Sequence, residues 1–320
     1  MYEFNINDYK KGDQITDIFV LSNVNIGLTK TKKEFMSLTL SNKNGNYDAK
    51  IWDLTDEIKE KFINGKIMII KGKIEEFNGN KQVIINKHKE PLEDQYDINN
   101  LVKSSKYNKD EMLNYILDTV ENMKDEQYKL ITSRLLNKYI KLYEKIGAAS
   151  KNHHNFMHGL LEHNYGILKS AKFMYQMYSD NLNEDRLYCG AILHDIGKVI
   201  EFECNEQGVV QGYTHAGQLL GHLVIGAQEV AKTCMELRNE GYEISYNTEM
   251  LVSHMLVSHH SEPEFGSVKR PALKEAELIY RLDSIDAFMQ IFDNVCDTLQ
   301  ENQLSDRQYN LGSRVIGKYK

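Results

Sequence analysis

The sequence predicts a multi-domain protein in which an all-β barrel is followed by an all-α helical bundle. Three observations support this prediction. The first third of the chain contains short runs that alternate apolar and polar residues, as strands do. From residue 152 to the mid-290s the pattern is helical, and Pro occurs there only at positions 263 and 271. Ten of the 11 histidines lie between His153 and His260, so we expect the chemistry in the helical part.

The amino-acid composition limits the classes of protein to which this chain could belong. The 320 residues are 41% hydrophobic and 27% charged, which is typical of a soluble globular chain long enough for two domains. A net charge of −7 argues against a surface built for bulk nucleic-acid binding, although a local basic groove remains compatible with it. Neither a membrane-spanning run nor a secretory pattern is found, and the four cysteines lack CxxC spacing, so we expect a cytoplasmic protein without disulfides.

The N-terminal elements follow the order of a known barrel. The turn sequences Asn44-Gly45 and Asn78-Gly79 predict two hairpins. In strand 35–40, Met36, Leu38 and Leu40 alternate with polar or aromatic residues and are expected to face the core. Five strands with a small helix between the third and the fourth are the order of an OB-fold barrel. The expected elements are strands 14–21, 35–40 and 47–52, helix 55–62, and strands 67–74 and 81–85.

The outer face of this barrel carries a candidate nucleic-acid surface. Phe35 lies on the face opposite the core residues, and Lys50 and Trp52 lie on the next strand. Aromatic rings that stack on bases, beside lysines that neutralise phosphates, suit single-stranded nucleic acid. The alternative is that Phe35 and Trp52 only close the ends of the barrel.

The rest of the chain is expected to be helical apart from its linkers. Residues 91–105 are polar and weakly patterned, and Asn108 with Glu111 has the spacing of a helix start. Helices should extend to about residue 146, and the polar stretch 303–320 is expected to fray. The predicted divisions are an OB-fold domain at 1–95, a linker with connecting helices at 96–150, a catalytic helical domain at 151–300 and a C-terminal tail at 301–320.

The helical part is organised around His194-Asp195, which ends an apolar run. Neighbouring imidazole and carboxylate groups can bind one divalent ion, and Gly197 permits a tight turn directly after them. Lys198 is then placed to contact a phosphate. Four further helical segments each supply a histidine or an aspartate in apolar surroundings, where an unpaired carboxylate would be costly. These residues are His163, His222, His259 and Asp283.

The donor set restricts the metal without identifying it. Mixed imidazole and carboxylate ligands suit manganese, iron, zinc or magnesium, and an octahedral site favours manganese or iron. For His88, His153 and His158 we expect ordinary hydrogen-bonded roles. The role of His254, and that of His154 beside His153, stays open.

The motifs resemble those of a known family. His163, His194-Asp195 and Asp283, in this order on separate helices, resemble the H…HD…D signature of HD-domain phosphohydrolases. His222 and His259-His260 are similar to the extended versions that bind two metal ions. Further matches extend the resemblance over nearly the whole chain, to the YhaM family of 3′-5′ exoribonucleases, which also carry an N-terminal OB-fold. Asn164 stands where Thr is usual and Ser261 where Gly is usual.

The resemblance implies one or two divalent ions, with manganese favoured, and hydrolysis of single-stranded RNA from the 3′ end to nucleoside 5′-monophosphates. Single-stranded DNA as a second substrate and a homo-oligomer both stay open. The implied catalytic residues are Lys198, at a phosphate, and His260, as a further ligand or a proton donor. The implied metal ligands are His163, His194, Asp195, His222, His259 and Asp283.

Two alternatives to the exoribonuclease remain at this point. The helical domain could hydrolyse a nucleotide or a cyclic dinucleotide, with the OB-fold in a regulatory role. The chain could also be a nucleic-acid-binding module with an inactive site, although an idle site has no reason to retain buried charges.

Overall fold

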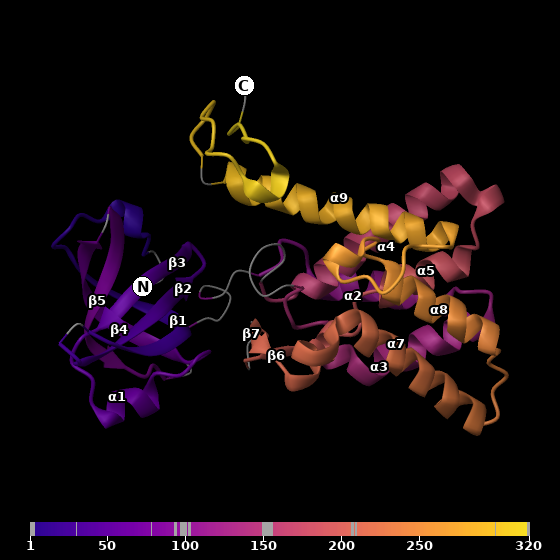
Figure 1. Cartoon of the computed structure of the whole chain (residues 1–320), viewed down its shortest axis with the longest axis horizontal. Coiled ribbons are helices and arrows are strands. Elements are labelled where there is room, and N and C mark those ends of the chain that lie inside the picture. The colour runs from indigo at the N-terminus through magenta and orange to yellow at the C-terminus, as the bar shows by residue number, and fades with distance from the viewer. Residues whose placement is uncertain are drawn as a thin grey trace. The chain divides into compact units, whose positions relative to one another are not determined.

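The computed structural model describes residues 4–29, 31–77, 79–92, 95–96, 101, 104–148, 156–205, 208, 210–297 and 299–318. The chain divides into two compact units, one of residues 1–104 with 204–211 and one of residues 105–203 with 212–320. The first unit is a closed β-barrel and the second is a helical bundle, as the sequence predicts (Figure 1). Within the described ranges, no helix combines the length and the apolar character needed to cross a membrane.

The barrel closes in the order β1-β2-β3-β5-β4, with β4 pairing back onto β1. β3 and β5 run parallel, and the other neighbouring strands run antiparallel. The small helix lies between β3 and β4 in the chain, so the OB-fold order is confirmed. The elements are β1 (Gln14–Leu28), β2 (Glu34–Asn42), β3 (Gly45–Ile51), α1 (Asp56–Lys61), β4 (Ile67–Phe77) and β5 (Asn80–Lys89).

The alternating pattern of β2 fixes its register on β3. Met36, Leu38 and Leu40 are all buried and lie opposite Ile51, Ala49 and Tyr47, which are buried as well. A slip of one residue would turn this entire apolar set toward water, so the pattern admits one register. The predicted inward face of this strand is therefore confirmed.

Side-chain caps begin most of the longer helices of the second unit. An N-cap oxygen accepts backbone N–H groups that the first helical turn leaves without a partner. The predicted start at Asn108 is confirmed, because its side chain accepts from the N–H groups of Asp110 and Glu111. Equivalent caps are Asp125 on α3 (Glu126–Tyr143), Asn183 on α5 (Glu184–Leu193), Thr214 on α7 (His215–Asn239) and Ser245 on α8 (Tyr246–Ser258).

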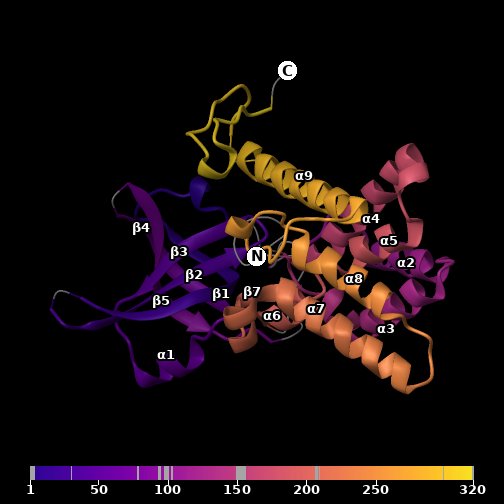
Figure 2. The ribbon, with the colours of Figure 1, turned by 45° about the vertical axis from the view of Figure 1, so that its right-hand side comes forward.

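Helix α5 (Glu184–Leu193) lies at the centre of the bundle. Residues 187–193 are all buried, and the helix packs against α3, α4, α8 and α9. Figure 2 shows α7 and α8 side by side. The other helices of the unit are α2 (Lys109–Glu121), α3 (Glu126–Tyr143), α4 (Gly159–Tyr178), α6 (Lys198–Glu201), α7 (His215–Asn239), α8 (Tyr246–Ser258) and α9 (Lys274–Cys296).

The structure departs from the sequence-based expectations at two places after residue 150. The stretch from 152 to the mid-290s, expected to be helical with short breaks, contains two short paired strands, β6 (Phe202–Cys204) and β7 (Val210–Tyr213). Their run of β-branched and aromatic residues is too short for its period to be recognised. The tail from 303 to 318 is folded rather than frayed, because Ser305 N–H donates to the Val315 carbonyl and Gly317 N–H to that of Gln303.

Gly197 holds the turn after α5 against α7. A Cβ at this position would lie 2.1 Å from the carbonyl oxygen of His222 and 2.8 Å from the nitrogen of Gly226. Both are backbone atoms, which cannot rotate away as a flexible side chain would. Glycine here allows the close approach that brings the His194-Asp195 turn to α7.

We expect the Gly197→Ala change to lower the free energy of unfolding by about 1–3 kcal/mol, because the added methyl group overpacks this contact. The matched control is Gly166→Ala on α4, where the new Cβ would meet only an Asp286 oxygen at 3.6 Å. The control should raise stability by about 0.5–1 kcal/mol, since alanine favours a helix over glycine. Urea unfolding followed by circular dichroism measures both. Equal effects of the two changes would contradict this account of the turn.

Candidate metal centre

The His194-Asp195 pair lies in the turn after α5 and is buried, with exposed fractions of 0% and 1%. His194 Nδ1 lies 3.0 Å from the carbonyl oxygen of Ala191 and donates to it, which leaves Nε2 with a lone pair. Burial lowers the pKa of His194 to about 3, so the ring is neutral. A neutral imidazole with one nitrogen fixed by a backbone carbonyl is the form that binds metals.

The first cluster of potential ligands joins His163 on α4, His194 and Asp195 after α5, and Asp283 on α9. His163 Nε2 lies 3.0 Å from His194 Nε2, 3.4 Å from Asp195 Oδ2 and 3.3 Å from Asp283 Oδ1. Two ligands about 2.1 Å from one ion and at roughly a right angle to each other lie about 3 Å apart. The structure thus brings together, at ligand spacing, four of the predicted residues from three separate helical segments.

The charges of the first cluster favour a cation. Burial opposes the protonation of His163, but its hydrogen bonds with Asp283 and Asp286 raise its pKa to about 10. Burial likewise opposes the ionisation of Asp283, yet the hydrogen bond from His163 holds the pKa of Asp283 well below its usual range. Two ionised carboxylates around one imidazole stabilise a positive charge there, whether it is a proton or a metal ion.

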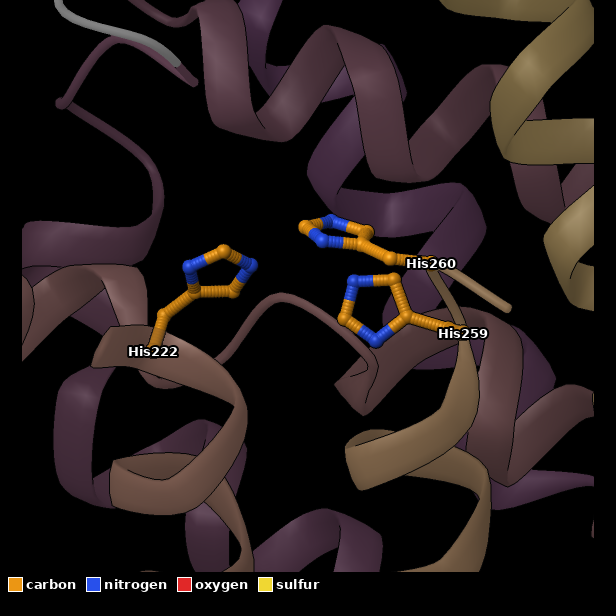
Figure 3. Close-up of side chains that lie close together, drawn as sticks. All are labelled: His222, His259 and His260. Carbon is orange, nitrogen blue, oxygen red and sulfur yellow. The ribbon is translucent and has the colours of Figure 1, made fainter. Parts of the chain in front are cut away.

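The second cluster joins His222, on α7, with His259 and His260, which directly follow α8. Figure 3 shows the three rings turned toward one another from two sides of a shared space. Their centroids are 5.6 Å apart for His222 and His259, 5.1 Å for His222 and His260, and 4.4 Å for His259 and His260. The potential ligand atoms of the three rings lie within 4.8 Å of one another.

Asp195 lies between the two clusters. Its Oδ2 faces His163, whereas its Oδ1 lies 3.4 Å from His222 Nε2 and 3.6 Å from His259 Nε2. Asp195 Oδ1, His222 Nε2 and His259 Nε2 belong to the buried polar atoms of the described residues that have no hydrogen-bond partner. Buried polar atoms without partners are costly and rare. A divalent cation at their point of convergence would satisfy all three, so the donors fit a metal ion there.

Lys198 reaches the carboxylate at the centre of this arrangement. Its Nζ lies 2.7 Å from Asp195 Oδ2. Burial would raise the pKa of Asp195, but the neighbouring Lys198 charge holds it well below its usual range. The ammonium group therefore keeps Asp195 ionised, in addition to the phosphate contact that the sequence suggests.

His260 lies in the second cluster, beside His222 and His259. Its Nδ1 lies 2.9 Å from the Phe265 carbonyl oxygen and donates to it, which leaves Nε2 available. Burial lowers the pKa of His260 to about 3, so this ring is neutral. A neutral ring with Nε2 available is chemically able to bind a metal ion.

Two carboxylates beside the clusters were not identified from the sequence. Asp286 Oδ2 lies 2.7 Å from His163 Nδ1, and Glu201 Oε2 lies 3.1 Å from His222 Nδ1. A signal existed for Asp286, which stands three residues after Asp283 and so on the same side of a helix. None existed for Glu201, because its distance from His222 depends on how α6 packs on α7.

The remaining histidines take other positions. His254 Nε2 accepts the N–H of Ala272 at 2.8 Å, His88 packs edge-on against Phe62, and His158 Nδ1 contacts the Glu144 carbonyl. His153 and His154 lie outside the described residues. Asn164 is fully buried. Ser261 adopts a φ of 62°, in the left-handed region that favours glycine, which accounts for the expectation of Gly at that position.

The predicted barrel surface forms a compact group. The Phe35 and Trp52 rings have centroids 5.2 Å apart, and Lys50 Nζ lies 5.8 Å and 5.4 Å from them. Phe77, which sequence reasoning did not select, adds a third ring 5.0 Å from Nζ. We call Phe35, Lys50, Trp52 and Phe77 the aromatic–lysine cluster. Trp52 is 39% exposed and Phe77 59% exposed, so these rings are available at the surface.

Comparisons with known proteins agree with this architecture. The HD domain family model matches residues 160–287, which hold both clusters. A solved OB-fold domain of replication protein A from Methanococcus maripaludis is similar at a TM-score of 0.23 and 13% identity, over 28% of this chain and 98% of that one. Because this TM-score is low, the OB-fold assignment depends on the strand order of the barrel and not on this similarity.

Two curated relatives match over nearly the full length. Both are named 3′-5′ exoribonuclease YhaM. The protein from Geobacillus sp. is 33% identical over 97% of this chain and 93% of its own length. The protein from Halalkalibacterium halodurans is 33% identical over 97% of this chain and 94% of its own length. The chain is therefore an HD-domain enzyme and belongs to the YhaM family of 3′-5′ exoribonucleases.

Proposed function

We propose that this chain is a metal-dependent 3′-5′ exoribonuclease that hydrolyses single-stranded RNA to nucleoside 5′-monophosphates. The observation that supports it most is the convergence of Asp195 Oδ1, His222 Nε2 and His259 Nε2, buried atoms without partners, beside a second cluster of potential ligands. The two relatives that match over 97% of this chain are both named 3′-5′ exoribonuclease. Cys189, Cys234 and Cys296 form no disulfide, which suits a cytoplasmic enzyme.

Each cluster would hold one divalent ion. His163, His194, Asp195 and Asp283 would bind the first, and His222, His259, His260 and Asp195 the second. Divalent ions so placed lower the pKa of water and offset charge on a phosphoryl group, and their nitrogen and oxygen ligands favour manganese or iron.

The protein's own groups prepare this site. The Ala191 carbonyl fixes the tautomer of His194, and the Phe265 carbonyl fixes that of His260. Lys198 keeps Asp195 ionised, so that Oδ1, which has no hydrogen-bond partner, would be able to bind a cation. Any N–H of Lys198 that Asp195 leaves free would face a phosphate oxygen of the substrate.

The domains would divide the work. We propose that domain 1–95 holds the strand through the aromatic–lysine cluster and that domain 151–300 cleaves it, joined by segment 96–150 and followed by tail 301–320. Stacking and a single cation grip a strand without selecting its sequence, so single-stranded DNA would bind as well.

The first prediction concerns the metal ligands. His194→Ala or Asp195→Asn should lower hydrolysis of 5′-labelled single-stranded RNA at least about a hundredfold, because the ions lose a direct ligand. RNA binding, measured by fluorescence anisotropy with metal present, should change less than about twofold. Asp283→Asn should lower the rate in the same way, and Asp293→Asn, which changes an exposed aspartate on the same helix α9, is its matched control and should leave the rate unchanged. Loss of binding with intact hydrolysis would contradict the proposed roles.

The second prediction concerns metal and products. With manganese, 5′-labelled RNA should shorten stepwise from its 3′ end, and chromatography should identify nucleoside 5′-monophosphates. EDTA should stop the reaction, and added manganese should restore it. If RNA stays intact while nucleotides or cyclic dinucleotides are hydrolysed, the metal site stands and the proposed substrate class is wrong.

The third prediction concerns the aromatic–lysine cluster. Trp52→Ala or Phe35→Ala should weaken RNA binding about 5- to 100-fold, since one stacked base contributes about 1–3 kcal/mol. Lys50→Ala should weaken binding and reduce its dependence on salt. Lys11→Ala, an exposed lysine of the same unit outside the cluster, removes the same charge and should have little effect. Equal losses for Lys50→Ala and Lys11→Ala would show that only overall charge matters.

A further inference from the structure

The side chain of Glu201 contacts both the backbone N–H and the imidazole ring of His222. The Glu201 side chain lies at the end of α6 and is only 6% exposed. Its Oε1 accepts the backbone N–H of His222 at 3.0 Å. His222 Nδ1 lies 3.2 Å from Oε1 and 3.1 Å from Oε2. This one carboxylate thus holds the backbone of His222 in place and also orients its imidazole ring.

A break in α7 makes this contact available. Gly221, directly before His222, has φ 69° and ψ 160° in the middle of the helix. A residue with a side chain would be strained at this backbone conformation. The kink leaves the N–H of His222 free to donate to Glu201 instead of to the carbonyl four residues earlier.

The backbone that carries Glu201 is itself held in place. Thr214 N–H donates to the Glu201 carbonyl at 2.9 Å, and the Thr214 hydroxyl donates to the Ile200 carbonyl at 2.9 Å. Thr214 also caps α7, the helix that supplies His222. Thr214 therefore connects the backbone of Glu201 to the start of α7, the helix that carries the ring of His222.

We propose that Glu201 is a positioning residue for the second ion, acting through His222. Accepting from Nδ1–H, it keeps the tautomer whose Nε2 lone pair faces Asp195 Oδ1 at 3.4 Å. Asp286 has the equivalent relation to His163 in the first cluster. Each ion would then have its own orienting carboxylate, so that the two sites can be weakened separately. This inference depends on the proposed function only in that the two clusters bind ions.

The test is titration of the metal-free full-length protein with manganese, with free Mn²⁺ measured by electron paramagnetic resonance. The variant is Glu201→Gln, which keeps the shape and can still accept the N–H of His222. Its amide offers one acceptor oxygen instead of two, so the backbone N–H and the Nδ1–H of His222 compete for that oxygen and the tautomer with Nε2 protonated gains population. We expect one ion per chain to bind 10- to 100-fold more weakly and the other to bind as in the unchanged protein.

Three further variants separate positioning from folding. Glu229→Gln is the matched control, because Glu229 lies on α7, the helix of His222, but contacts Lys138 and Tyr139 outside both clusters. It should retain both affinities. Gly221→Ala should weaken the same ion as Glu201→Gln, since strain at the kink moves the N–H of His222. Asp286→Asn should weaken the other ion. Melting of each metal-free variant shows whether it is folded.

The outcomes are distinct. If folded Glu201→Gln binds both ions with unchanged affinity, the proposal is overturned. It is also overturned if both ions bind equally more weakly, because that result indicates a general loss of structure around the site. Uptake of a single ion by the unchanged protein would also overturn it. RNA hydrolysis is assayed on the same samples. If Glu201→Gln weakens one ion selectively but the unchanged protein does not cleave RNA, the role of Glu201 is supported and the exoribonuclease activity is refuted. If the unchanged protein cleaves RNA but Glu201→Gln alters neither metal affinity, the activity is supported and the role of Glu201 is refuted.

Discussion

The structure of the catalytic unit depends on one buried carboxylate. Asp195 has an exposed fraction of 1% and stays ionised because Lys198 lies 2.7 Å away. Its two oxygens face different groups of imidazoles, so a single side chain connects the two clusters. A buried charge of this kind is stable only when its surroundings compensate it, and here the surroundings are the ammonium group of Lys198 and the imidazoles of the two clusters.

The packing around α5 determines the position of the Asp195 carboxylate. The helix is buried on every side, and Gly197 lets the following turn press against the α7 backbone. His163, His222 and Asp283 arrive on three other helices that each contact this region. Ligands from so many elements are rigid relative to one another because the core between them is close-packed. The site is therefore a property of the whole bundle rather than of one loop.

Much of the arrangement could be predicted from the sequence, and the exceptions share a cause. Strand order, the inward face of β2 and the cap at Asn108 depend on neighbours in the chain, and the structure agrees with them. The hairpin at 202–213 and the folded tail depend on pairing between short segments, for which local pattern is a weak guide. Glu201 was missed for the same reason, since its partner is 21 residues away in the chain and the contact exists only because α7 is kinked.

The sequence by itself determined the classes of the two domains and the residues able to bind metal, because period, turn chemistry and the clustering of histidines are local properties. Only the tertiary structure decided how those residues divide. It placed His260 with His222 and His259, turned Lys198 onto Asp195, and set Asp286 and Glu201 behind two of the imidazoles. The physical reason is that the tautomer, charge and direction of a buried side chain depend on the atoms packed against it, and these come from distant parts of the chain.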